Sequence, residues 1–204
     1  MGEFKSGCGA VIAVKHRTRG KSHLAGDLSP ASRITLIRAM LDRVVRAAEA
    51  AHSLAFTVVV SPERDTVPAR VPVLHDEGIG LNEALTAARE RLRATGIRHL
   101  LVLPGDLASI DAQDIDALVD AGRRTGVALA PDAAGLGTNG LVSDIDLPFI
   151  YQFGTDSRRR HVAEARRLDI EPLVVMRPGL EFDVDSPPDL RRLGGLPWAC
   201  EATG

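Results

Sequence analysis

Cysteines and long apolar runs are both scarce in this chain of 204 residues. Its two cysteines, Cys8 and Cys200, stand at opposite ends of the sequence, which excludes a disulfide framework and a cysteine-based zinc site. No apolar stretch approaches the ~20 residues that a bilayer span needs. The segment Met1–Gly7 lacks the apolar core of a secretory signal. We therefore expect a cytoplasmic protein with no membrane partner.

Neither sign of charge dominates the composition. The 25 basic and 27 acidic side chains leave a formal net charge of −2, so no strong field favours a nucleic-acid partner. An apolar fraction of 45% is enough for a sizeable core. Length and composition predict a single domain over 1–204, with residues 1–9 outside its ordered part. Oligomeric state stays open between monomer and homodimer.

Several sequence motifs that would define a site are absent. The chain has no Walker sequence, which excludes a P-loop protein. It has no G-x-S-x-G elbow, which disfavours a serine hydrolase. No histidine pair shows the i, i+4 spacing of a zinc site on a helix. His161 follows three arginines on a predicted helix, and we expect it on a solvated basic face.

Apolar segments rich in β-branched residues alternate with helical patterns. The expected strands are Ala10–Val14, Phe56–Val60, Leu100–Leu103, Val127–Ala130, Leu173–Met176 and Glu181–Val184. The expected helices start at Ser29-Pro30, Asn82, Asp111, Thr155 and Ser186-Pro187, and residues 135–140 are expected to form a loop. This order predicts an α/β fold with a mostly parallel sheet and helices on both faces.

Ligands of such folds bind at the carboxyl ends of the strands. The loop after the first predicted strand carries Lys15 and Lys21, two of only three lysines in the chain, together with several arginines and histidines. Lysines at a strand end, followed by a helix N-terminus, can bind phosphate oxygens. A solvated basic loop is the alternative.

Carboxylates occupy two further positions of this kind. Asp106 follows the strand Leu100–Leu103, and Asp183 and Asp185 follow each other at a spacing of two. Residues two apart in a strand point to one face, so these two carboxylates repel each other unless a cation lies between them. Mg²⁺ is commonly held by one or two carboxylates plus phosphates and water. We therefore expect Asp106, Asp183 and Asp185 to form a magnesium site.

Glycine and hydroxyl residues recur together in the second half of the chain. They are Gly137-Thr138-Asn139-Gly140 and Gly154-Thr155-Asp156-Ser157. Glycine lets a ligand approach the backbone, and the second group opens a predicted helix whose free N–H groups suit an anion. Taken alone, a Ser or Thr at a helix start is usually only a cap.

These pieces together resemble a known family. Ala13-Val14-Lys15, Gly20-Lys21-Ser22, Gly80-Leu81-Asn82, Gly105-Asp106-Leu107, Gly137-Thr138, Phe153-Gly154 and Asp183-Val184-Asp185 occur in the order found in phosphoenolpyruvate and 2-phospholactate guanylyltransferases. These enzymes have a nucleotidyltransferase fold and make a guanylylated phospho-acid for coenzyme F-420. The resemblance covers about Val11 to Leu193. His23 departs from it, because the family usually has an arginine there.

The resemblance implies roles for individual residues. Asp106, Asp183 and Asp185 would hold Mg²⁺, with Asp106 and Lys21 acting in catalysis. The nucleotide GTP would meet Lys15, Lys21, Gly80, Asn82 and Gly105. Thr138, Gly154 and Ser157 would hold a small phospho-acid, which could be phosphoenolpyruvate, 2-phospholactate or 3-phosphoglycerate. Because the acceptor phosphate is already an anion, the transfer needs no general base.

Three alternatives remain at this point. A glycosyltransferase is one, since this class also uses a D-x-D motif. Its motif normally lies in the first half of the domain, whereas Asp183-Val184-Asp185 lies near the C-terminus. Molybdopterin guanylyltransferases usually begin with a glycine-rich loop, whereas this chain has Val14-Lys15-His16-Arg17 there. A non-catalytic GTP sensor on the same fold is the third, since His23 could mark a decayed site.

Overall fold

The computed structural model describes residues 7–14, 24, 26–76, 78, 80–184 and 186–194. The elements in these ranges are β1 (Cys8–Ala13), α1 (Pro30–Ala50), β2 (Leu54–Ser61), η2 (Arg64–Thr66), β3 (Val73–His75), α2 (Leu81–Arg93), β4 (His99–Pro104), α3 (Ala112–Thr125), β5 (Val127–Pro131), β6 (Thr138–Asp144), α4 (Ser157–Arg167), β7 (Leu173–Val174), α5 (Pro178–Glu181) and α6 (Pro187–Leu193).

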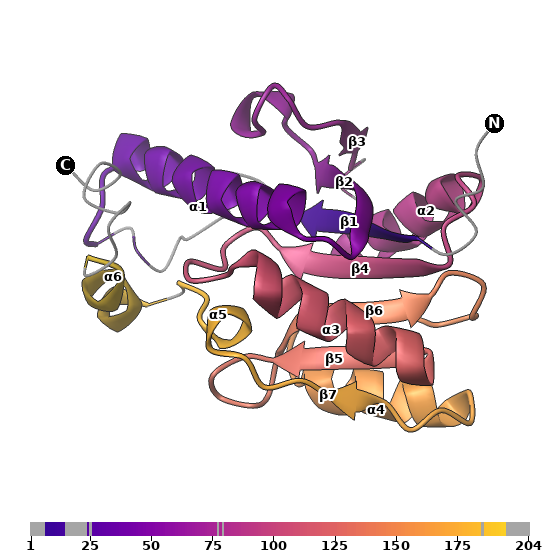
Figure 1. Cartoon of the computed structure of the whole chain (residues 1–204). Coiled ribbons are helices and arrows are strands. Elements are labelled where there is room, and N and C mark those ends of the chain that lie inside the picture. Colours follow the sequence, from indigo (N-terminus) through magenta and orange to yellow (C-terminus); the bar gives the residue numbers. More distant parts are fainter. Residues whose placement is uncertain are drawn as a thin grey trace.

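The described strands form one sheet in the order β3-β2-β1-β4-β6-β5-β7. All of its pairings are parallel except those of β6, which runs antiparallel to both β4 and β5. The arrowheads of β4 and β5 point toward the side where α5 and α6 lie, and that of β6 points away from it (Figure 1). The carboxyl ends of the parallel strands and the amino end of β6 therefore share one edge.

Helices cover both faces of the sheet, as the sequence predicted. Alternate residues of β4 enter different cores, because successive strand side chains point to opposite faces. Leu101 and Leu103 pack in the core under α1 and α3, whereas Leu100 and Val102 pack in the core under α2 and α4. The mostly parallel α/β class is confirmed (Figure 1).

The predicted helix starts are confirmed at three places. The Ser29 hydroxyl accepts from the Ser32 N–H at 3.1 Å, with Pro30 at the first helical position. Asp111 caps α3, and Ser186 caps α6, each within a capping box. Among the described residues, no helix is long and apolar enough to cross a membrane.

The last two residues of the segment 1–9 belong to the sheet, contrary to the prediction. Residues 1–9 were expected to lie outside the folded part, but Cys8 and Gly9 belong to β1, and Cys8 is fully buried. A Cβ on Gly9 would lie 2.7 Å from the Phe56 ring. The absence of a side chain at Gly9 therefore lets this ring pack over the start of the strand.

The predicted loop over residues 135–140 is wrong in its second half, because Thr138 to Gly140 begin strand β6. This strand escaped the sequence pattern because it contains a glycine and an asparagine, which are rare in strands. The glycine is explained by close helix packing. A Cβ on Gly140 would lie 2.6 Å from Leu118 Cδ2 of α3.

Candidate active site

The ends of β1 and β4 approach each other closely at the shared edge. The Gly105 N–H donates to the Ala13 carbonyl at 3.0 Å, and a Cβ on Gly105 would lie 3.1 Å from Val14 Cγ2. Glycine therefore permits the close approach that sets Asp106 beside the end of β1. The Gly105 amide is already bonded, so any contact of this residue with a nucleotide must use its carbonyl or Cα.

The segments of Asp106 and Asp183 lie side by side. An antiparallel bridge joins Leu107 to Asp183, and the Ala108 N–H donates to the Phe182 carbonyl at 3.2 Å. These contacts bring together two residues that are far apart in the sequence. The predicted pairing of the two carboxylate segments is thus present in the fold.

The alternation predicted around Asp183 is also present. Phe182 and Val184 are 3% and 0% exposed, and Asp183 between them is half-buried. The expected strand over 181–184 is wrong, however, since Glu181 ends the short helix α5 and only Asp183 forms a bridge. Helix α5 ends at Glu181 and α6 begins at Pro187, so few residues lie between them to form a strand.

The carboxylates of this edge suit a hard divalent cation in their chemistry. Asp106 and Asp183 are both half-buried, so solvent and a ligand can reach them. Within the described ranges, no group of three or more His, Cys, Asp or Glu could hold a metal ion. The third predicted ligand, Asp185, lies outside these ranges, as do Lys15 and Lys21.

Thr138 begins β6 at the same edge, and its side chain is only 7% exposed. Its hydroxyl lies 3.0 Å from His161 Nδ1. His161 is completely buried on α4, so its predicted place on a solvated face is wrong. The side of α4 that carries Ser157 and His161 faces the sheet, because residues four apart share one helix face.

The His161 ring contacts Gln152 and Phe153 as well as Thr138. Its Nε2 accepts from the Gln152 N–H at 2.9 Å, and the Phe153 ring packs edge-on against it with centroids 4.7 Å apart. Burial lowers the pKa of His161 to about 4, and the lowering effect of Arg160 is opposed by the nearby Glu164. The ring is therefore neutral at pH 7.

Gly154 and Ser157 flank the start of α4. Gly154 has φ +124°, a conformation that favours glycine, and a Cβ there would meet nothing within 4 Å. Ser157 is 2% exposed. The helix begins at Ser157 after Asp156, so the predicted cap at Thr155 is wrong. Asp156 takes that place with φ +58°, and its carboxylate pairs with Arg159 instead of capping the helix.

The start of α4 offers fewer free N–H groups than the sequence suggested. The Ser157 N–H donates to the Gly154 carbonyl at 3.2 Å, and the Arg158 N–H donates to the Leu136 carbonyl at 3.0 Å. The first donor is used by Gly154 in the turn just before α4, and the second by Leu136 in the loop before β6. The expected anion site on these two amides is therefore not formed.

Asn82, predicted near the nucleotide, binds the backbone next to Gly154. Its Oδ1 accepts from the Phe153 N–H at 2.8 Å, and its Nδ2 donates to the Phe153 carbonyl at 3.2 Å. Gly80 precedes α2 with φ +136°, and a Cβ there would collide with the Glu83 carboxylate. Residues from the predicted nucleotide and acceptor sites thus meet at one place.

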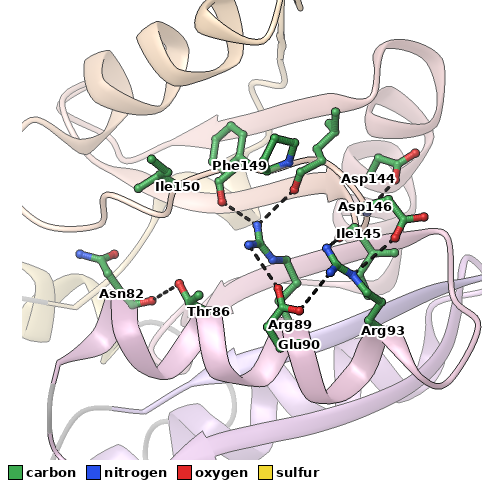
Figure 2. A network of polar contacts seen from close by, with 12 residues as sticks. Asn82, Thr86, Arg89, Glu90, Arg93, Asp144, Ile145, Asp146, Phe149 and Ile150 are labelled. Carbon is green, nitrogen blue, oxygen red and sulfur yellow. Dashed lines mark hydrogen bonds and ion pairs between the residues drawn. The ribbon is translucent and has the colours of Figure 1, made fainter.

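Two arginines of α2 that were not predicted as site residues bind backbone carbonyls in the segment that precedes Phe153. Arg89, 7% exposed on α2, donates to the Phe149 carbonyl at 2.6 Å. Arg93 donates to the Ile145 carbonyl at 3.2 Å. Figure 2 shows both side chains reaching from α2 across to this segment. A buried arginine is hard to detect from sequence, because arginine is usually exposed.

Comparison with known proteins identifies the family. The family model described as guanylyl transferase CofC like matches residues 8–194. A phosphoenolpyruvate guanylyltransferase of Sphaerobacter thermophilus is 38% identical over 91% of this chain and 92% of its own length. One from Rubrobacter xylanophilus is 39% identical over 90% of this chain and 92% of its own length.

Solved structures agree with the fold. A protein from Desulfovibrio desulfuricans G20, described as a nucleotide-diphospho-sugar transferase, superposes with a TM-score of 0.74 at 16% identity, covering 93% of this chain and 86% of its own. A 4-diphosphocytidyl-2C-methyl-D-erythritol synthase superposes with a TM-score of 0.62 at 16% identity, covering 92% and 97%. The chain therefore belongs to the guanylyl transferase CofC-like family, and it is a nucleotidyltransferase.

Proposed function

We propose that this chain transfers GMP from GTP to the phosphate of phosphoenolpyruvate, in the cytoplasm and for coenzyme F-420 biosynthesis. The relatives with this activity in their names support it, since they match along about nine-tenths of the chain. The structural observation that carries the proposal is the bridge between Leu107 and Asp183. It holds two carboxylate segments together at the edge where α/β proteins bind ligands.

The reaction is a displacement at phosphorus. An oxygen of the acceptor phosphate attacks the α-phosphorus of GTP, and a new P–O bond forms there. The bond from the α-phosphorus to the bridging oxygen breaks, and its electron pair leaves with pyrophosphate. Nothing is oxidised or reduced. The protein's contribution is alignment of the two substrates and neutralisation of their charge.

Different residues would bind the two substrates. Lys15 and Lys21 would neutralise the triphosphate, near Gly80, Asn82 and Gly105. Thr138, Gly154 and Ser157 would bind the phospho-acid on the other side. The pair of hydrogen bonds between Asn82 and Phe153 supports this division, because it sets the start of α2 beside Gly154.

The donor set at the sheet edge fits Mg²⁺. Asp106 and Asp183 supply oxygen ligands from adjacent segments, and Asp185 follows two residues later in the sequence. Mg²⁺ prefers carboxylate and phosphate oxygens over nitrogen or sulfur. When bound, the ion would offset negative charge that builds up on the phosphate oxygens.

The test measures pyrophosphate release from GTP with Mg²⁺, offering phosphoenolpyruvate, 2-phospholactate and 3-phosphoglycerate separately. We expect release with phosphoenolpyruvate and none without an acceptor. Release with a different phospho-acid would replace the acceptor and keep the guanylyl transfer. Tight GTP binding with silence toward all three would overturn the proposal in favour of a GTP sensor.

A further inference from the structure

Two hydrogen bonds fix the tautomer of His161. The Gln152 backbone amide can only donate, so the Nε2 that it contacts at 2.9 Å must carry a lone pair. A neutral imidazole with a bare Nε2 carries its proton on Nδ1. The Nδ1–H therefore donates to the Thr138 hydroxyl oxygen, 3.0 Å away.

This contact determines what Thr138 can offer to a ligand. Its oxygen accepts the hydrogen bond from Nδ1–H, so its own O–H points away from His161 and can donate to another acceptor. Thr138 stands at the start of β6, on the edge that also carries Asp106. An anionic oxygen accepts hydrogen bonds and cannot donate them, so it matches a hydroxyl held in this way.

The same ring also holds the backbone on the other side of the predicted acceptor site. Gln152 is two residues before Gly154, and the Phe153 ring packs edge-on against the imidazole. Ser157 lies one helical turn before His161 on the buried face of α4. The three predicted acceptor residues are thus arranged around one histidine.

We infer that His161 is a positioning residue for the acceptor: it sets the Thr138 hydroxyl as a donor to an anionic oxygen of the phospho-acid and fixes the backbone that leads to Gly154. This inference rests on the proposed function, since the acceptor is the substrate of that reaction. The neutral ring suits this role, because an imidazolium would direct a second N–H at the Gln152 amide.

Two conservative variants separate the contacts of His161. In His161→Asn the side-chain amide can replace Nδ1–H and donate to Thr138. In His161→Gln the side-chain oxygen can replace Nε2 and accept from Gln152, while the contact with Thr138 is lost. We expect the KM for phosphoenolpyruvate to rise about tenfold in His161→Gln and much less in His161→Asn, with the KM for GTP unchanged in both.

A double-mutant cycle with Thr138→Val tests whether the effect passes through the hydroxyl. In the Thr138→Val background, which has no hydroxyl to orient, His161→Gln should leave the acceptor KM unchanged. An equal rise in both backgrounds would mean that the histidine acts only on general packing, and would overturn the inference.

Nitrogen NMR of the wild-type histidine supplies a readout that needs no variant and no turnover. We expect a protonated Nδ1 and a bare Nε2 at pH 7; the opposite tautomer or an imidazolium would overturn the role of His161 by itself. Absence of turnover with all three phospho-acids in the wild type would instead overturn the proposed function. Turnover with the same acceptor KM in all His161 variants would overturn the positioning role alone.

Discussion

Asn82 and Phe153, 71 residues apart in the sequence, form a reciprocal pair of hydrogen bonds. The asparagine amide accepts from the Phe153 N–H and donates to the carbonyl of the same residue, so it pairs with the backbone as a neighbouring strand would. Phe153 directly precedes Gly154, which is exposed. The first turn of α2 therefore holds in place the loop around Gly154, where the acceptor is predicted to bind.

Asn82→Ala should loosen this loop without unfolding the protein. Loss of two hydrogen bonds to a half-buried backbone should lower the free energy of unfolding by about 1–2 kcal/mol. The Phe153 amide should exchange its hydrogen faster, which hydrogen-exchange mass spectrometry or NMR can measure. Thr86→Ala is the matched control, because this exposed hydroxyl donates to the Asn82 carbonyl within the same helix. An unchanged rate of hydrogen exchange at the Phe153 amide in Asn82→Ala would contradict the role of Asn82 in holding this loop.

Gly154→Ala tests the backbone conformation of the loop. Since a Cβ at this position has open space, any effect must come from the positive φ of +124°. Strain of this kind costs roughly 1–3 kcal/mol unless the loop changes conformation. We expect either a lower melting temperature or a raised KM for the acceptor, both measurable on one preparation. Gly26→Ala is the control, since it also has free space around the Cβ but no positive φ; equal behaviour of the two variants would remove the argument.

The fold was predictable because its signals are local. Runs such as Leu100–Leu103, buried on both faces, and proline-led helix starts such as Ser29-Pro30 depend on a few adjacent residues. Strand β6 was not predicted because its residue types are explained by contacts with residues that are distant in the sequence. Gly140, for example, is small because α3 packs on it, and no sequence window contains that contact.

Part of the arrangement of the candidate site was predictable from local signals. Asp106 could be selected because it follows strand β4, and Asp183 because of its spacing of two from Asp185, and the fold brings the segments of Asp106 and Asp183 together. His161 could not, because three preceding arginines dominate the local pattern and the partners of its ring are Thr138 and Gln152. The i, i+4 spacing from Ser157 was the one signal that pointed inward.

Asp106→Asn tests the predicted metal site. The amide removes the negative charge that a divalent cation requires but keeps the shape of the side chain. We expect pyrophosphate release to fall at least about a hundredfold, while the circular dichroism spectrum and melting temperature stay close to those of the wild type. Asp120→Asn is the control, because this exposed carboxylate pairs with Arg123 within α3. Normal activity of Asp106→Asn with the same Mg²⁺ dependence would contradict the assignment.

Lys21→Ala tests the predicted triphosphate loop. Removal of one cation that contacts phosphate oxygens should raise the KM for GTP by about one order of magnitude, with a smaller change in the KM for phosphoenolpyruvate. Lys5→Ala changes the net charge of the chain equally and precedes the family-like region, so it serves as the control. A GTP dependence that is the same in both variants would remove Lys21 from the site.

Acid should destabilise the protein through His161. Its pKa is about 4 in the folded state, below the ordinary value of 6.5, so the unfolded chain binds the extra proton first as the pH falls. The contribution of His161 to the free energy of unfolding is therefore fully present above about pH 6.5, and it is lost on acidification toward pH 4. Between pH 7 and pH 5 this group should remove roughly 2 kcal/mol from the free energy of unfolding.

Urea unfolding of the wild type and of His161→Gln at several pH values measures this contribution. Burial also lowers the pKa of His99, so the wild-type slope contains two histidines of the same sign. Lowering of the Glu164 pKa acts below its ordinary value of 4.5, outside the window. Glutamine at position 161 does not titrate, so the stability of this variant should fall less between pH 7 and pH 5, and the contribution of His99 remains. The same slope in both proteins would show that His161 is not buried as a neutral ring, and the tautomer argument for Thr138 would fail with it.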